Sequence, residues 1–169
     1  MVWYTLLVAA VAAERLFELV VAERNRRWSR MRGGIEAGAG HYPVMVVLHT
    51  GLLVGCLLEV AALHRPFLPM LGFSMLVLVL AAQGLRWWCI TTLGRQWNTR
   101  VIVVPGATRI TGGPYRLIRH PNYVAVIVEG IALPLVHSAW LTALLFTVLN
   151  AALLKTRIDV ENAALAGLR

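Results

Sequence analysis

Long apolar segments alternate with short polar ones along the whole chain. The apolar segments cover residues 2–22, 42–63, 67–85, 120–136 and 139–154. A helix needs about 20 residues, with a range of about 17–25, to cross a bilayer core of ~30 Å. The pattern therefore predicts an all-α, polytopic membrane protein with about five transmembrane helices. The length of 169 residues predicts a single domain over residues 1–169.

The polar connections predict how these helices are joined. His64-Arg65-Pro66 is so short that the second and third helices must form an antiparallel hairpin. Gly94 offers a C-cap for the third helix, which can continue that far beyond its apolar part. The fifth helix is expected to leave the membrane and continue through Ala166.

Residues 95–119 form the longest polar connection, and a connection of this length in so small a protein is usually functional or disordered. Trp97 and the β-branched residues in 97–104 favour an ordered, extended segment that turns at Pro105-Gly106. We expect this segment to lie as a lid over a bound cofactor.

The charges support a membrane protein and indicate its orientation. Apolar residues make up 59% of the chain, charged residues only 14%, and the net charge is +8. Five arginines lie between Arg24 and Arg32 and six between Arg86 and Arg119, whereas only Arg65 lies in the alternate connections. The positive-inside rule then places the N-terminus outside and the C-terminus in the cytoplasm, in the inner (cytoplasmic) membrane. The basic charge is a topology signal, aided by anionic membrane lipid, and nucleic acid is not an expected partner.

Several charged residues lie inside the apolar segments, where burial is expensive. Arg15 and Glu18 are spaced i,i+3 and predict a structural pair; the alternative is that they line the functional site. Glu129 lies about two turns into the fourth helix, where an unpaired carboxylate would be costly, so it is a candidate for chemistry.

Other polar residues in these segments favour structural interpretations. His49 is expected to be a hydrogen-bonded core histidine, since a haem would want a second mid-membrane histidine on a facing helix. Glu59, near the outer end of its helix, is expected to reach water. Cys56 and Cys89 are expected to be buried free thiols.

The stretch 112–129 joins the arginine-rich connection to the fourth helix and is the most informative part of the chain. Gly112-Gly113-Pro114 allows a sharp turn, and Pro121 suits the first turn of a helix. Arg116, Arg119 and His120 lie beside that helix N-terminus, and a helix N-terminus with cations around it favours an anionic group. We expect this corner to hold the carboxylate end of a charged cofactor at the membrane surface.

Three motifs carry a resemblance to a known family: Gly113-Pro114-Tyr115, Arg119-His120-Pro121-Asn122-Tyr123 and Arg157-Ile158-Asp159-Val160-Glu161. Together they resemble the isoprenylcysteine carboxyl methyltransferase family, integral membrane enzymes that use S-adenosylmethionine, over residues 93–165. The stretch 93–101 and Glu129 look like a bacterial subgroup that accompanies type III polyketide synthases and methylates long-chain alkylpyrones. Eukaryotic members end with paired glutamates, whereas here Asn162 follows Glu161.

The resemblance implies roles for individual residues. Cofactor binding falls to His120, Tyr123 and Glu161, to Arg119, and to the backbone around Tyr115, Arg116 and Leu117. Arg157 would meet the acceptor oxygen, and Glu129 or Glu161 could act as general base. Trp97, Asn98 and Arg100 are acceptor-side candidates, and no metal is expected.

The resulting hypothesis is a methyltransferase acting on an oxygen of a lipophilic acceptor, most specifically an alkylpyrone-type polyketide. A prenylcysteine carboxyl methyltransferase is the nearest alternative, and a membrane reductase with a nicotinamide cofactor is another. A non-enzymatic membrane scaffold or transporter-like helper is the alternative of a different class, although a transporter would more naturally show inverted repeats.

Overall fold

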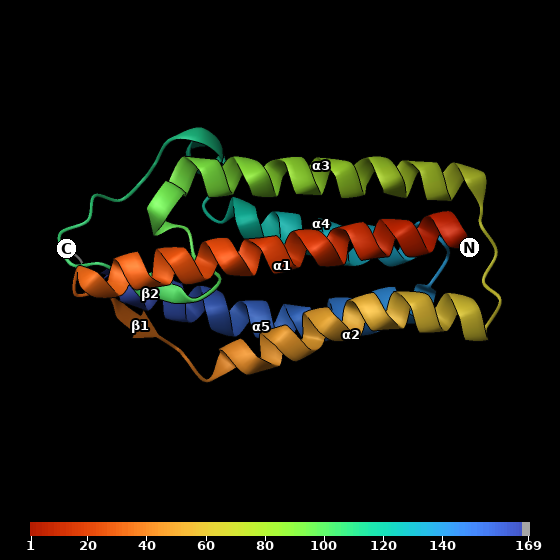
Figure 1. The fold of residues 1–169 in the computed structure, drawn as a ribbon, viewed down its shortest axis with the longest axis horizontal. Coiled ribbons are helices and arrows are strands. Elements are labelled where there is room, and N and C mark those ends of the chain that lie inside the picture. The colour runs from red at the N-terminus through yellow and green to blue at the C-terminus, as the bar shows by residue number, and fades with distance from the viewer. Residues whose placement is uncertain (167–169) are drawn as a thin grey trace.

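The computed structural model describes residues 1–166 and contains the five expected helices. They are α1 (Val2–Met31), α2 (His41–Ala62), α3 (Pro69–Leu93), α4 (Pro121–Leu135) and α5 (Trp140–Ala166). Figure 1 shows them running alongside one another as an elongated bundle. The all-α prediction is confirmed, as are the C-cap at Gly94, the proline in the first turn of α4 and the extension of α5. The first helix is longer than its apolar segment and ends only at Met31.

Helix α4 lies between α3 and α5 and packs against both, while α2 packs against α5 (Figure 1). The core of the bundle contains Tyr4 from α1 and Leu133 from α4, and the Tyr4 hydroxyl donates to the Leu133 carbonyl at 3.0 Å. Gly130 allows Phe146 to approach α4 closely, because a Cβ at position 130 would lie 2.0 Å from the phenyl ring. These contacts fix α4 as the central helix of the fold.

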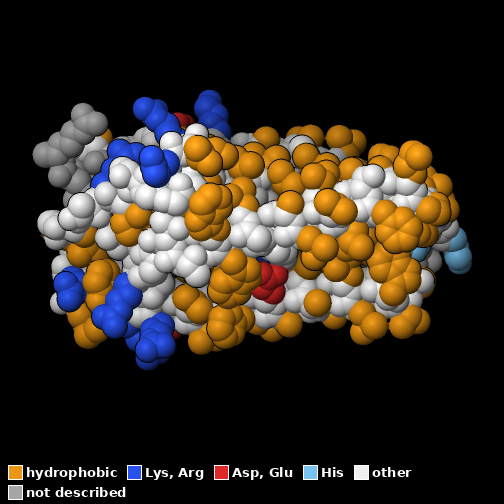
Figure 2. Space-filling view, turned by 90° about the horizontal axis from the view of Figure 1, so that it is seen from above, with side chains coloured by type: hydrophobic (Ala, Val, Ile, Leu, Met, Phe, Trp, Pro, Cys, Tyr) orange, Lys and Arg blue, Asp and Glu red, His pale blue; other side chains and the backbone are white. Residues whose placement is uncertain are grey.

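Among the described residues, three helical segments are long and apolar enough to cross a membrane: His41–Ala62, Pro69–Gln96 and Trp140–Ala164. Figure 2 shows hydrophobic side chains spread over much of one face of the bundle, away from its basic end. A polytopic membrane protein is therefore confirmed. Helix α4 is shorter, at 15 residues, and α1 carries charges along its length, so crossing of the membrane by these two helices stays a prediction.

Lysine and arginine side chains gather at one end of the bundle (Figure 2). This end contains the C-terminal part of α1 and a small antiparallel sheet, formed by β1 (Ile35–Ala37) and β2 (Val101–Val103). Ile35 pairs with Val103 and Ala37 with Val101. The predicted extended segment is thus present in β2, but its partner strand from the first connection was not predicted. The assignment of this basic end to the cytoplasm stays a prediction.

The prediction that Glu59 reaches water was wrong. Its side chain is buried, and its carboxylate accepts hydrogen bonds from the backbone N–H groups of Leu141 at 3.1 Å and Thr142 at 2.7 Å, and from the Thr142 hydroxyl at 2.8 Å. Arg65 completes the contact at 2.9 Å. The first turn of α5 has N–H groups without intrahelical partners, and a carboxylate from α2 satisfies them.

Replacing Glu59 with alanine is expected to lower the free energy of unfolding by about 2–3 kcal/mol, because hydrogen bonds to a charged group are removed and buried N–H groups are left unsatisfied. Thermal unfolding in detergent would measure the change. Glu23→Ala is the matched control, because Glu23 makes only local pairs with Arg26 and Arg27 on α1. Equal effects of the two changes would contradict the capping role.

The structural expectations for His49, Cys56 and Cys89 are confirmed. The Nδ1–H of His49 donates to the Met45 carbonyl at 2.9 Å, and the ring packs edge-on against Phe146. Cys56 and Cys89 are buried free thiols.

Candidate active site

A cavity of about 220 Å³ lies at the basic end of the bundle. Its walls come from the end of α3, the segment around β2, the start of α4 and the end of α5. Nine residues predicted for the site line this cavity: Trp97, Asn98, Arg100, Tyr115, Arg119, His120, Tyr123, Arg157 and Glu161. Segments distant in sequence therefore meet in one pocket, as the motifs predicted.

A 3-10 turn, η2 (Gly113–Arg116), positions Tyr115 on the cavity wall. Gly113 has φ +54, and a Cβ there would lie 2.5 Å from the Thr92 hydroxyl, so only glycine fits this turn against α3. Burial raises the pKa of the Tyr115 phenol, and the neighbouring Cys89 acts in the same direction. Tyr115 is therefore a neutral hydroxyl that can donate or accept a hydrogen bond.

The N-terminus of α4 opens into the cavity. His120 is the N-cap, Pro121 begins the helix, and the His120 ring stacks on Tyr123 with 5.4 Å between ring centroids. His120, Asn122 and Tyr123 all line the cavity. This end of a helix carries partial positive charge from its peptide dipoles, so it favours an anionic ligand group.

Glu161 joins the start of α4 to the end of α5. The Tyr123 hydroxyl donates to its carboxylate, and His120 Nδ1 lies 3.6 Å from the same group. The carboxylate is partly exposed to the cavity, which leaves it able to accept further hydrogen bonds. Together Tyr123, His120 and Glu161 form an acidic, hydrogen-bonding corner.

Arg157 lies one turn before Glu161 on α5 and is 6% exposed. One guanidinium N–H donates to the Thr99 carbonyl at 2.9 Å, another contacts the Met45 sulfur, and the group lies 5.7 Å from the Tyr123 ring centroid. Within residues 1–166 no carboxylate lies within ion-pair distance of it, and Glu161, four residues further along α5, contacts His120 instead. Arg157 is a buried cation on the wall of the cavity, and it lacks a protein counterion in this part of the chain.

Comparison with known proteins identifies the family. The model of the isoprenylcysteine carboxyl methyltransferase (ICMT) family matches residues 75–167, which include the whole of α4 and every motif of the site. The chain belongs to this family. The chain is 37% identical over 163 residues to uncharacterized protein YpbQ of Bacillus subtilis (strain 168). The match covers 96% of this chain and 96% of the Bacillus protein.

Membership in the ICMT family makes this chain one of a group of membrane methyltransferases that use S-adenosylmethionine. The residues around the cavity fit such a ligand, which carries a carboxylate, an ammonium group and a ribose. Three buried polar atoms on the cavity wall have no hydrogen-bond partner among the described residues: Trp97 Nε1, Asn122 Oδ1 and Arg157 Nε. Buried polar atoms are normally paired, so these atoms indicate a polar ligand.

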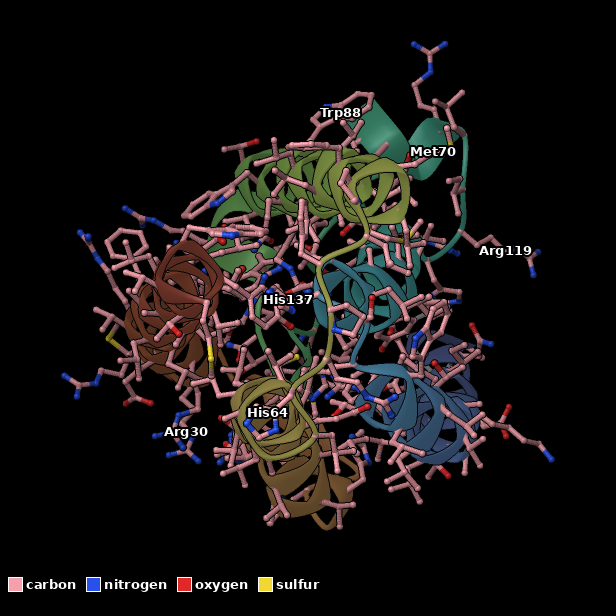
Figure 3. All side chains as sticks on the ribbon, turned by 90° about the vertical axis from the view of Figure 1, so that its right-hand side faces the viewer. Arg30, His64, Met70, Trp88, Arg119 and His137 are labelled. Atoms are coloured by element: carbon pink, nitrogen blue, oxygen red, sulfur yellow. The ribbon has the colours of Figure 1, made fainter. Side chains whose placement is uncertain are left out.

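Arg116 and Leu117 do not line the cavity of this ICMT family member. Both are exposed, and Leu117 is 78% exposed. The exposed Arg119, labelled in Figure 3, belongs to the rim. Any contact of Arg116 and Leu117 with the cofactor stays a prediction that concerns their backbone.

Arg100 lines the cavity but its guanidinium is already engaged. It bonds to Glu36 of β1 at 2.5 Å and lies 3.9 Å from the Tyr42 ring centroid. Arg100 directly precedes β2, so this ion pair links the start of β2 to β1 and gives Arg100 a local role in holding β2. Its contact with an acceptor stays a prediction, as does that of Asn98, whose amide donates to the Ala22 carbonyl at 3.3 Å.

Glu129 lies deeper in α4 and outside the cavity lining. Its carboxylate accepts from Arg86 at 2.6 Å and from Arg15 at 2.9 Å, and Arg15 also binds Glu18 at 2.6 Å. The predicted Arg15–Glu18 pair is confirmed, within a larger network that ties α1 to α3 and α4. A catalytic role for Glu129 stays a prediction.

Sequence reasoning missed several cavity residues. Asn122 occupies the variable position of the Arg-His-Pro-x-Tyr box and could have been included with the box. Ser29, from the extended end of α1, and Arg109, from the long connection, gave no local signal. They reach the cavity through the tertiary fold.

Proposed function

We propose that this chain transfers the methyl group of S-adenosylmethionine to an anionic oxygen of a lipophilic acceptor. The observation that carries the proposal is Arg157, a buried guanidinium on the cavity wall without a carboxylate partner in residues 1–166. A buried cation is costly unless it is paired, so its partner is expected to be the acceptor. The cavity lies at one end of apolar helices, where a lipid can bring a polar head to the membrane surface.

The cofactor would be held by the corner around the start of α4. The helix N-terminus and Arg119 suit its carboxylate, Glu161 suits its ammonium group, and Tyr115 and the amide of Asn122 suit its hydroxyl groups. S-adenosylmethionine supplies an electrophilic methyl when bound. His120 and Tyr123 hold Glu161 in place through the contacts described above.

The contribution of the protein is to position the acceptor and exclude water. Arg157 donates hydrogen bonds to the acceptor oxygen and favours its anionic form. Correct placement of two reactants can supply roughly 7–11 kcal/mol of the barrier. An acidic enol or a carboxylate needs no strong base. For a less acidic hydroxyl we assign the proton to Glu161, the carboxylate on the cavity wall.

For the acceptor we propose a long-chain alkylpyrone-type polyketide, with a functional link to a type III polyketide synthase. The substitution of Asn162 for a second terminal glutamate favours this over prenylcysteine. A prenylcysteine carboxylate would suit Arg157 equally well by charge, and the family name supports it. Offering the purified protein both acceptors with labelled methyl donor would separate them, since only one is expected to become methylated.

Cofactor binding gives the direct test of the proposal. His120→Ala and Tyr123→Phe are each expected to weaken binding of radiolabelled S-adenosylmethionine about tenfold, equivalent to ~1.4 kcal/mol, because each loses a contact that orders Glu161. His64→Asn, at the opposite end of the bundle (Figure 3), is the control and should bind as the original protein does.

Unchanged binding in both site variants would remove the cofactor assignment. Binding of a pyridine nucleotide in place of S-adenosylmethionine would indicate the reductase alternative. Failure to bind either would indicate a membrane scaffold. Labelling of native membranes and mass spectrometry of the methylated lipid would then identify the acceptor.

A further inference from the structure

A second, smaller cavity of about 100 Å³ lies in the seam between α4 and α5, two helices that lie side by side (Figure 3). It is lined by Ile127, Phe146, Thr147, Asn150, Ala151 and Leu154. Ile127 is 42% exposed and Ala151 is exposed, so the cavity opens on the outer surface of the bundle. In a membrane this surface faces lipid chains.

One polar group interrupts this otherwise apolar groove. Asn150 is 3% exposed, and its Oδ1 is buried with no hydrogen-bond partner among the residues that the structure describes. The Thr147 hydroxyl is not available to it, since it donates to the Ala143 carbonyl at 2.7 Å. An amide left unpaired in an apolar membrane groove costs free energy, and a ligand with one hydrogen-bond donor would remove this cost.

The groove lies along the same two helices that carry Tyr123 and Arg157 of the candidate active site. Leu154 precedes Arg157 by three residues on α5, and Ile127 follows Tyr123 by four on α4. The groove therefore begins about one helical turn, ~5.4 Å, from Tyr123 on α4 and Arg157 on α5. Phe146 is held against Gly130, which keeps its ring on the wall of the groove.

We infer that the α4–α5 groove binds the hydrocarbon tail of the methyl acceptor, and that Asn150 favours a tail bearing a hydroxyl. This inference rests on the proposed function for the identity of the lipid. Arg157 holds the anionic head and the tail leaves the site along the seam. Asn150 is seven residues from Arg157, so the favoured hydroxyl lies about 10 Å from the head, at ~1.5 Å per residue.

Two photoactivatable fatty acids of equal length test the inference, one with a hydroxyl about 10 Å from the carboxylate and one without it. In the purified protein in nanodiscs, we expect the hydroxylated probe to label residues 146–154 about fivefold more than the plain probe. This is the gain in binding that one added hydrogen bond would give. Ala151→Leu, which fills the groove from its exposed side, should lower labelling of that segment by both probes about fivefold. Ala152→Leu, exposed on the same helix but outside the groove, is the matched control.

Asn150→Leu should abolish the preference for the hydroxylated probe and leave labelling by the plain probe within twofold. Equal labelling by the two probes in the original protein would overturn the role of Asn150. Labelling of 146–154 that Ala151→Leu does not change would overturn the groove itself. Cofactor binding, measured separately on the same samples, distinguishes failure of this inference from failure of the proposed function.

Discussion

Replacing Arg157 with leucine is expected to lower kcat/KM for methyl transfer by about 10²-fold, because the acceptor oxygen would lose the group that orients it toward the methyl and favours its anionic form. The guanidinium is the buried cation that the acceptor oxygen would meet in the cavity. Arg157→Lys should restore only part of the rate, since an ammonium cannot donate to the Thr99 carbonyl and to the acceptor in the same planar geometry. Initial rates at several acceptor concentrations would measure these effects.

Binding of S-adenosylmethionine separates this role from a general loss of structure. In both Arg157 variants the cofactor dissociation constant should stay within about threefold of the original value. This is a smaller change than the tenfold weakening, equivalent to ~1.4 kcal/mol, that is expected of a cofactor-site variant. Lys155→Leu is the matched control, because Lys155 is exposed on the same helix and should keep full activity. Unimpaired turnover by Arg157→Leu would show that the acceptor is held elsewhere.

The arrangement of the helices could be predicted from sequence because apolar periodicity and chain breaks are local signals. The short link at 64–66 and the proline at the start of α4 needed no tertiary information. The extension of α1 to Met31 was missed because its last residues are polar and hydropathy gives no sign of helix there. The pairing of β1 with β2 was missed because each strand has only three residues, and their contact joins two connections far apart in sequence.

The site was predictable as far as its motifs extend. The boxes around His120 and Arg157 were correctly expected to meet, because both lie at helix ends on the side marked by arginines. The i,i+4 spacing of Arg157 and Glu161 on one helix would permit an ion pair, but the structure turns Glu161 toward Tyr123. The same limit applies to Glu59, whose partners at the start of α5 lie more than eighty residues away in the chain. The sequence pattern shows that a charged residue lies on a helix, but only the tertiary structure shows which residue it pairs with.

The buried network around Glu129 is the clearest case in which tertiary packing decides the partners of a charged residue. Arg86 was counted among the arginines that mark the cytoplasmic side, yet it lies buried, bonds to Glu129 of α4 and approaches Glu18 of α1. Two carboxylates and two guanidinium groups, Arg15 and Arg86, balance one another between three helices. Such a network satisfies its charges internally, which explains how α1 can carry them among apolar helices.

Replacing Glu129 with leucine is accordingly expected to lower the free energy of unfolding by about 3–5 kcal/mol, because Arg15 and Arg86 would lose a shared, buried partner. Chemical unfolding in detergent, followed by far-UV circular dichroism, would measure the loss. The double change Arg86→Leu with Glu129→Leu keeps the network neutral and leaves the Arg15–Glu18 pair intact, so it should recover about half of that loss.

The conservative change Glu129→Gln separates the structural role from a catalytic one, since glutamine keeps the shape of the side chain but removes its charge. A structural carboxylate predicts that stability falls, while cofactor affinity and turnover per folded molecule stay within about threefold, well below the 10²–10⁴-fold that general acid–base catalysis contributes. A catalytic base predicts the reverse, with a large fall in turnover at unchanged stability. The cavity lining excludes Glu129 and the two arginines occupy its carboxylate, so we expect the first outcome.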